Sequence, residues 1–181
     1  RQPVASFNVQ TLHAFTVRLM TGTDFLGDFK LVPMTAPLLW VRYFALALIV
    51  GAIIIAARSP RTRHWDLLTF SITLVVAIVA SPLAWSHYHS MLLLPFTLYF
   101  MGVLGLARDR FTTRAMIIST VLCSLPVMYL KLYQGPVTSR TVVSATLIGA
   151  CLLLVVLVRT AWSQRDASPL NAIASPAAHR G

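Results

Sequence analysis

The pattern of apolar and charged positions divides the chain into five long apolar runs separated by short polar segments. A helix needs about 20 residues to cross a hydrocarbon core of about 30 Å. The stretch 67–107 contains no Lys, Arg, Asp or Glu, and as one helix it would be about 60 Å long, so it must fold into two spans. The pattern therefore predicts an all-α, polytopic membrane protein with transmembrane helices near Leu38–Ala57, Leu67–Ala84, Ser90–Ala107, Ala115–Leu132 and Thr141–Val158.

The break inside the uncharged stretch is predicted at Pro82, which lacks an N–H and clashes with a preceding helical turn. The segment 81–95, SPLAWSHYHSMLLLP, is then a hairpin at one membrane interface. It carries a Trp, a Tyr and two His between two prolines. This hairpin is the first place where polar chemistry gathers in the chain.

Composition and charge agree with a membrane protein and predict its orientation. Only 11% of residues are charged, against about 25% in soluble domains. The net charge of +10 does not indicate a nucleic-acid-binding protein, because the basic residues punctuate apolar runs. Eight of them follow the first, third and fifth predicted spans: Arg58, Arg61, Arg63, Arg108, Arg110, Arg114, Arg159 and Arg165. The opposite loop has Lys131 and Arg140, so the positive-inside rule predicts the N-terminus outside and the C-terminus in the cytoplasm. We expect the membrane to be a bacterial plasma membrane.

This orientation divides the chain into three parts. Residues 1–37 are predicted to be an outer-face segment, and residues 38–158 a five-span transmembrane domain. Residues 159–181 are predicted to be a disordered cytoplasmic tail, because their Ser, Ala and Pro residues bury too little apolar area to offset the entropy of ordering.

The outer-face segment contains a predicted amphipathic helix. Its apolar stripe has helical spacing and consists of Val9, Leu12, Phe15 and Leu19. We expect this helix to lie along the outer interface. Two interpretations of its polar residues stay open. They are solvated, or Gln10 and Arg18 donate hydrogen bonds to an anion such as the phosphate of a lipid carrier.

The hairpin also has several interpretations. Trp85 and Tyr88 are typical of an aromatic belt at headgroup depth. His87 and His89 are polar residues of a wet turn, or they bind a metal together with His13, or His87 positions or protonates a substrate group. No carboxylate or Cys stands beside the two histidines, so we expect no metal.

Both segments resemble one enzyme family. The hairpin segment SPLAWSHYHSMLLLP is similar to the Ser-Pro-x-Ser-Trp-Asp/Glu-His stretch of the GT87 (DUF2029) glycosyltransferases, which are GT-C-type membrane enzymes. The N-terminal segment NVQTLHAFTVRL resembles the Asn-Gln-Ser-Leu segment of the same family, which is followed by Arg-Leu. The matching positions are Gln10, Thr11, Leu12, Arg18, Ser81, Pro82, Trp85, His87 and Pro95. The chain departs from the family pattern at Val9, Ala84 and Ser86, where the family has Asn, Ser and an acid.

The resemblance implies a reaction and a site. A hexose, often mannose, would pass from a polyprenyl-phosphate donor to a lipid or glycan acceptor at the outer face, without a cofactor and with membrane lipids as neighbours. The implied substrate-binding residues are Gln10, Thr11, Arg18, Trp85 and His87.

The family's catalytic Asp raises a separate expectation. It lies in a first outer loop that would fall upstream of Arg1, so the resemblance implies a C-terminal portion that is inactive alone. Asp24 and Asp28 are expected to be solvated loop or helix-capping residues rather than the catalytic base.

Two other function classes stay open. A non-catalytic integral membrane subunit or scaffold would use the hairpin only as an interfacial anchor. A transporter would need polar groups near the middle of the bilayer, and the predicted spans contain no ionisable pair. The sequence therefore favours a membrane glycosyltransferase, with the scaffold as the alternative.

Overall fold

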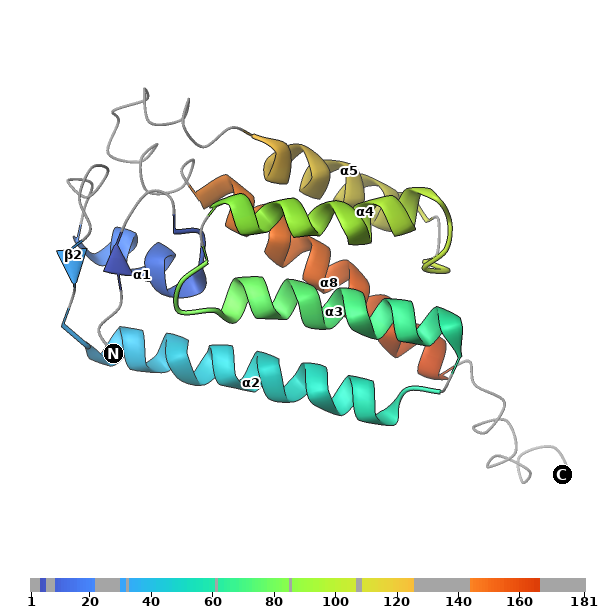
Figure 1. Cartoon of the computed structure of the whole chain (residues 1–181), viewed down its shortest axis with the longest axis horizontal. Coiled ribbons are helices and arrows are strands. Elements are labelled where there is room, and N and C mark those ends of the chain that lie inside the picture. The colour runs from blue at the N-terminus through green and yellow to red at the C-terminus, as the bar shows by residue number, and fades with distance from the viewer. Residues whose placement is uncertain are drawn as a thin grey trace, which may run out of the picture.

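The computed structural model describes residues 4–5, 9–21, 30–31, 33–60, 62–84, 86–106, 109–125 and 144–166. Within these ranges the protein is all-α apart from a pair of two-residue strands, in which Val4 pairs with Leu31 and Ala5 with Lys30. Figure 1 shows the helices as a bundle with the short α1 across one end. The elements are β1 (Val4–Ala5), α1 (Leu12–Thr21), β2 (Lys30–Leu31), α2 (Ala36–Arg58), α3 (Arg63–Ala80), the 3₁₀-helix η1 (Ser86–Leu92), α4 (Leu93–Phe100), α5 (Arg110–Ser124) and α8 (Ala145–Asp166).

Three of the described helices are long and apolar enough to cross a membrane, namely α2, α3 and α8. They correspond to the first, second and fifth predicted spans. α3 ends at Ala80, which agrees with the break predicted from Pro82, because the residue before a proline is disfavoured in the helical region. The membrane class of the chain is therefore supported by length and apolarity.

The boundary predicted for the C-terminal tail is wrong. α8 continues to Asp166 instead of ending near Val158. Thr160 and Ala161 are buried against the rest of the bundle, and this burial extends the helix beyond the apolar run. The remainder of the predicted tail, residues 167–181, lies outside the described residues, as do the interhelical loop at 126–143 and Trp85.

The third predicted span, Ser90–Ala107, is not one continuous α-helix. It begins in η1, continues through α4 and ends at Gly102, which has a φ of 74°. The Gly102 N–H donates to Tyr99 O at 2.8 Å and the Val103 N–H to Leu98 O at 2.9 Å. These two bonds form a Schellman motif, which satisfies carbonyl groups at the helix end. An apolar run alone did not reveal this stop. The fourth predicted span appears in the described residues as the 15-residue α5.

α3 is the centre of the bundle, because it packs against both α2 and α8. α5 lies along the other side of α8, where the Ser119 Oγ donates to Gly149 O at 2.6 Å. At the end of the bundle remote from α1, His64 lies 3.1 Å from Val103 O and 3.0 Å from the Gln164 Oε1. These contacts join α3, α8 and the segment after α4 at that end of the bundle.

Candidate functional site

The N-terminal segment and α1 turn their polar side chains into the protein. Gln10 and Thr11 are fully buried, and Arg18 is 4% exposed. The Thr11 Oγ1 accepts a hydrogen bond from the Ala14 N–H at 3.2 Å, as an N-cap residue does. The interpretation that these polar residues are solvated is therefore wrong. Leu19, a member of the predicted apolar stripe, is 44% exposed.

Arg18 connects α1 to the start of α8. Its Nη1 donates to Val9 O at 2.9 Å, and its Nη2 donates to the Ser144 Oγ at 2.9 Å, across 126 residues of sequence. Desolvation by burial lowers the pKa of Arg18 to about 10, so the side chain keeps its charge at neutral pH. The N-terminus of a helix carries a partial positive charge. The guanidinium and the start of α8 therefore create a region of positive potential.

The hairpin meets the N-terminal segment through the backbone. The Gln10 N–H donates to Ala84 O at 2.9 Å, and Ala84 is buried. The hairpin itself is shaped by Ser81, whose Oγ accepts from the Leu83 N–H at 3.2 Å. The two segments that carry the family resemblance are thus in direct contact.

The two histidines of the hairpin lie in η1 and have different surroundings. His87 is exposed, and its ring lies 4.5 Å from the Tyr88 ring, between centroids. His89 is 5% exposed. In a 3₁₀-helix with three residues per turn, side chains two positions apart differ in direction by about 120°. The spacing of the two histidines therefore separates them, which a hairpin drawn from the sequence could not show.

The arrangement of the histidines does not form a metal centre among the described residues, where no group of three His, Cys, Asp or Glu comes together. The hypothesis that His13, His87 and His89 bind a metal is wrong for this reason. His13 is 7% exposed. Its pKa is lowered from the usual value by desolvation and, secondly, by the charge of Arg42.

Sequence reasoning missed Ser144 as a partner of Arg18. It lies just before α8, and a lone Ser inside a predicted span carries no signal of such a contact. Trp85, Asp24 and Asp28 were singled out from the sequence and lie outside the described residues. The structure therefore brings Gln10 and Arg18 to the same end of the bundle as the exposed His87.

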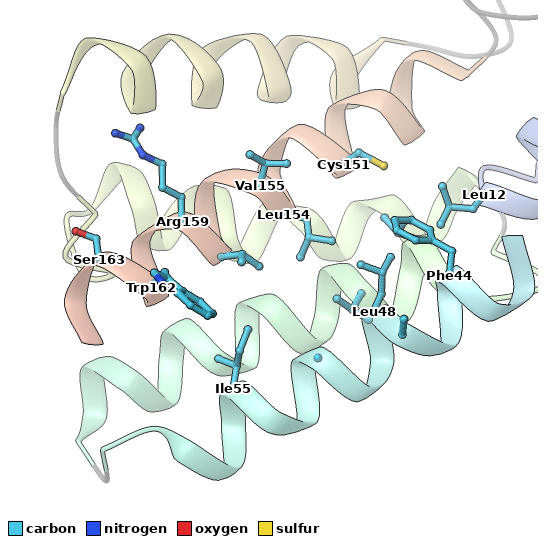
Figure 2. Close-up of a pocket in the computed structure, with 15 residues that line it drawn as sticks. Leu12, Phe44, Leu48, Ile55, Cys151, Leu154, Val155, Arg159, Trp162 and Ser163 are labelled. Atoms are coloured by element: carbon cyan, nitrogen blue, oxygen red, sulfur yellow. The ribbon is translucent and has the colours of Figure 1, made fainter. Parts of the chain in front are cut away.

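A large apolar groove lies between α2 and α8, with α3 as its floor, and we call it the α2–α8 groove (Figure 2). Its volume is about 860 Å³. Leu12 of α1 lines one end, and Arg159, Trp162 and Ser163 line the other. No local sequence pattern indicates this groove, because its lining residues come from four separate helices.

Comparisons of this chain with protein-family models, curated proteins and solved structures found no match.

Proposed function

We propose that this chain forms the part of a membrane hexosyltransferase that binds a polyprenyl-phosphate-linked sugar, with mannose as the expected sugar. One observation carries the proposal, namely the hydrogen bond from the Gln10 N–H to Ala84 O. The two segments that resemble the glycosyltransferase family were selected from the sequence separately, about 70 residues apart. A shared site requires that they meet, and a scaffold that used the hairpin only as an anchor would have no such requirement.

The chemistry of the surrounding residues supports the same proposal. Breaking the bond between a sugar and a phosphate leaves a phosphate dianion, which a fixed cation stabilises. The buried Arg18 at the start of α8 supplies this cation, and its planar fork suits phosphate oxygens. Gln10 and Thr11 bring further polar groups to the same segment, and the exposed imidazole of His87 is suited to orienting or protonating a reacting group.

In this proposal the chain crosses the membrane five times and the site faces outward. η1 and α4 together would extend about 26 Å along a common axis, because a 3₁₀-helix rises about 2.0 Å per residue and an α-helix 1.5 Å. That length is close to the hydrocarbon thickness. α1 would lie at the outer interface, with the exposed Leu19 and Met20 in contact with lipid. The basic residues at the other end of the bundle favour the cytoplasmic side there.

The first test is binding of the phosphate group. The purified chain in detergent is titrated with undecaprenyl phosphate and, in parallel, with undecaprenol, which has the same chain without the phosphate. We expect only the phosphate to raise the midpoint of thermal unfolding. The variant Arg18→Gln should weaken binding of undecaprenyl phosphate about tenfold or more, because it removes a charge-assisted contact to the phosphate. Arg18→Lys keeps the charge and should weaken binding less.

The second test concerns transfer of the sugar. In membranes that contain the chain together with any segments encoded next to it, radiolabelled polyprenyl-phosphate mannose should be consumed, and His87→Ala should slow this consumption. Met91→Ala is the matched control, because Met91 is also exposed on η1. Equal binding of the phosphate and the alcohol would refute the proposal. Unchanged transfer in both His87→Ala and Arg18→Gln would instead favour the non-catalytic scaffold.

A further inference from the structure

The α2–α8 groove has a shape and a lining that suit one hydrocarbon chain. Its walls are made by α2 and α8, two of the helices long enough to cross a membrane. On the α2 side Gly51 opens onto it, and a Cβ atom added at Gly51 would have no atom within 4 Å. Val76 and Val79 of α3 form part of the floor. We expect apolar groups rather than water to occupy the middle of this groove, because water needs hydrogen-bonding partners and the described lining residues there are apolar.

Polar groups line only one end of the groove. At that end lie Arg159, Trp162 and Ser163 of α8, as Figure 2 shows. At the other end the lining residues are Leu12 and Phe44, which are apolar. Trp is typical of the level of the lipid headgroups, and Trp162 is 62% exposed. Among the described residues, the lining of the groove is therefore apolar over most of its length, with its one charged residue, Arg159, at one end.

Arg159 is held in place and remains accessible. Its Nη2 lies 3.6 Å from the Asp109 Oδ2, and its guanidinium carbon lies 4.8 Å from the centre of the Phe111 ring. The side chain of Arg159 is nevertheless 53% exposed. An exposed ion pair at this separation is weak, so Asp109 does not prevent a second anion from binding to the guanidinium.

We propose that the α2–α8 groove binds an anionic phospholipid from the leaflet on the Arg159 side, with its phosphate at Arg159 and one acyl chain along the groove. Charge decides the occupant. The same end of the bundle carries Arg58 and Arg63, which attract anionic headgroups. This site is distinct from the proposed sugar-donor site, since Arg159 is about 22 Å along α8 from Ser144. It does not depend on the proposed function.

The test compares two lipids that differ only in their headgroups, of which one is anionic and the other zwitterionic. The full chain in detergent is mixed with equal amounts of phosphatidylglycerol and phosphatidylcholine with identical acyl chains, and native mass spectrometry counts the lipids that stay bound. We expect the wild type to retain phosphatidylglycerol in preference. Arg159→Gln should lower the ratio of bound phosphatidylglycerol to phosphatidylcholine about tenfold. Arg114→Gln, which removes an exposed charge outside the groove lining, should leave the ratio unchanged.

The acyl-chain part of the proposal has its own variants. Gly51→Phe or Gly51→Leu fills the groove and should reduce retention of both lipids severalfold. Ile53→Phe is the matched control, because Ile53 is 61% exposed and does not line the groove. The unfolding midpoint of each variant shows that it is folded.

A third variant separates lipid binding from the ion pair. Asp109→Asn keeps an N-cap residue for α5 and removes the competing carboxylate, so binding of phosphatidylglycerol should be equal or stronger. Equal loss in Arg114→Gln and Arg159→Gln would overturn the proposal, because it would reduce the effect to net charge. So would unchanged retention in both Gly51 variants, or weaker binding in Asp109→Asn.

Discussion

The close approach of α5 to α8 at Gly149 makes a quantitative prediction for Gly149→Ala. An added Cβ at Gly149 would lie 2.8 Å from the Cys123 Sγ, 3.0 Å from the Leu122 Cβ and 3.0 Å from Ser119 O. The third atom belongs to the backbone, so side-chain rotation alone cannot make room and α5 must move away from α8. Overpacking of this kind costs about 1–3 kcal/mol. The better helix propensity of Ala returns about 1 kcal/mol, which leaves a net loss of up to about 2 kcal/mol, so Gly149→Ala should be about 1–3 kcal/mol less stable than a Gly→Ala variant without the clash.

Gly51→Ala is the internal control for this prediction. Nothing lies within 4 Å of a Cβ at Gly51, so this variant should be unchanged or up to about 1 kcal/mol more stable. Both variants are unfolded with sodium dodecyl sulfate in mixed micelles, and helix content is followed by circular dichroism. In the Gly149→Ala background, Cys123→Ala should recover part of the loss, because it removes the nearest atom but not the Ser119 carbonyl. Equal stability of the two Gly→Ala variants would refute the packing of α5 on α8.

Three further predictions use the same unfolding assay. Gly105→Ala should lose at least about 1 kcal/mol, because Gly105 has a φ of +55° and an added Cβ would lie 2.5 Å from the His64 Cε1; an unchanged midpoint would contradict the turn. Ser119→Ala should lose about 1 kcal/mol by removing the buried bond to Gly149 O, and a stabilised variant would argue against that bond. The pKa of His13 is lowered in the folded protein, so on acidification the unfolded chain takes up a proton at this histidine before the folded chain does. The contribution of the neutral His13 to folding stability is therefore present above pH about 6.5 and is lost as the pH falls below that value. His13→Asn should therefore reduce the loss of stability between pH about 7.5 and about 5.5, and an equal loss would show that His13 is not the group responsible.

Local patterns in the sequence were sufficient to predict the helices that depend on a single segment. Apolar runs long enough for a membrane predicted α2, α3 and α8, because length and apolarity are properties of a single segment. The end of α3 at Ala80 followed from Pro82, since a proline acts on its own neighbours. Two local signals were outweighed. The continuous apolar run 90–107 predicted one span, although the helix ends in a Schellman motif at Gly102. The polar residues after Val158 predicted a helix end, although α8 continues to Asp166.

Only the tertiary structure decided which faces of these helices are buried. Helical periodicity groups Gln10, Thr11 and Arg18 apart from the apolar stripe, but it does not say which group faces the protein when lipid or an interface lies outside. The buried position of Arg18 depends on Ser144, 126 residues away. The α2–α8 groove likewise needs lining residues from four helices, and Gly51 opens onto space because no side chain of another helix fills it. Contacts between distant segments are set by packing of the whole bundle, and no single stretch of this sequence contains them.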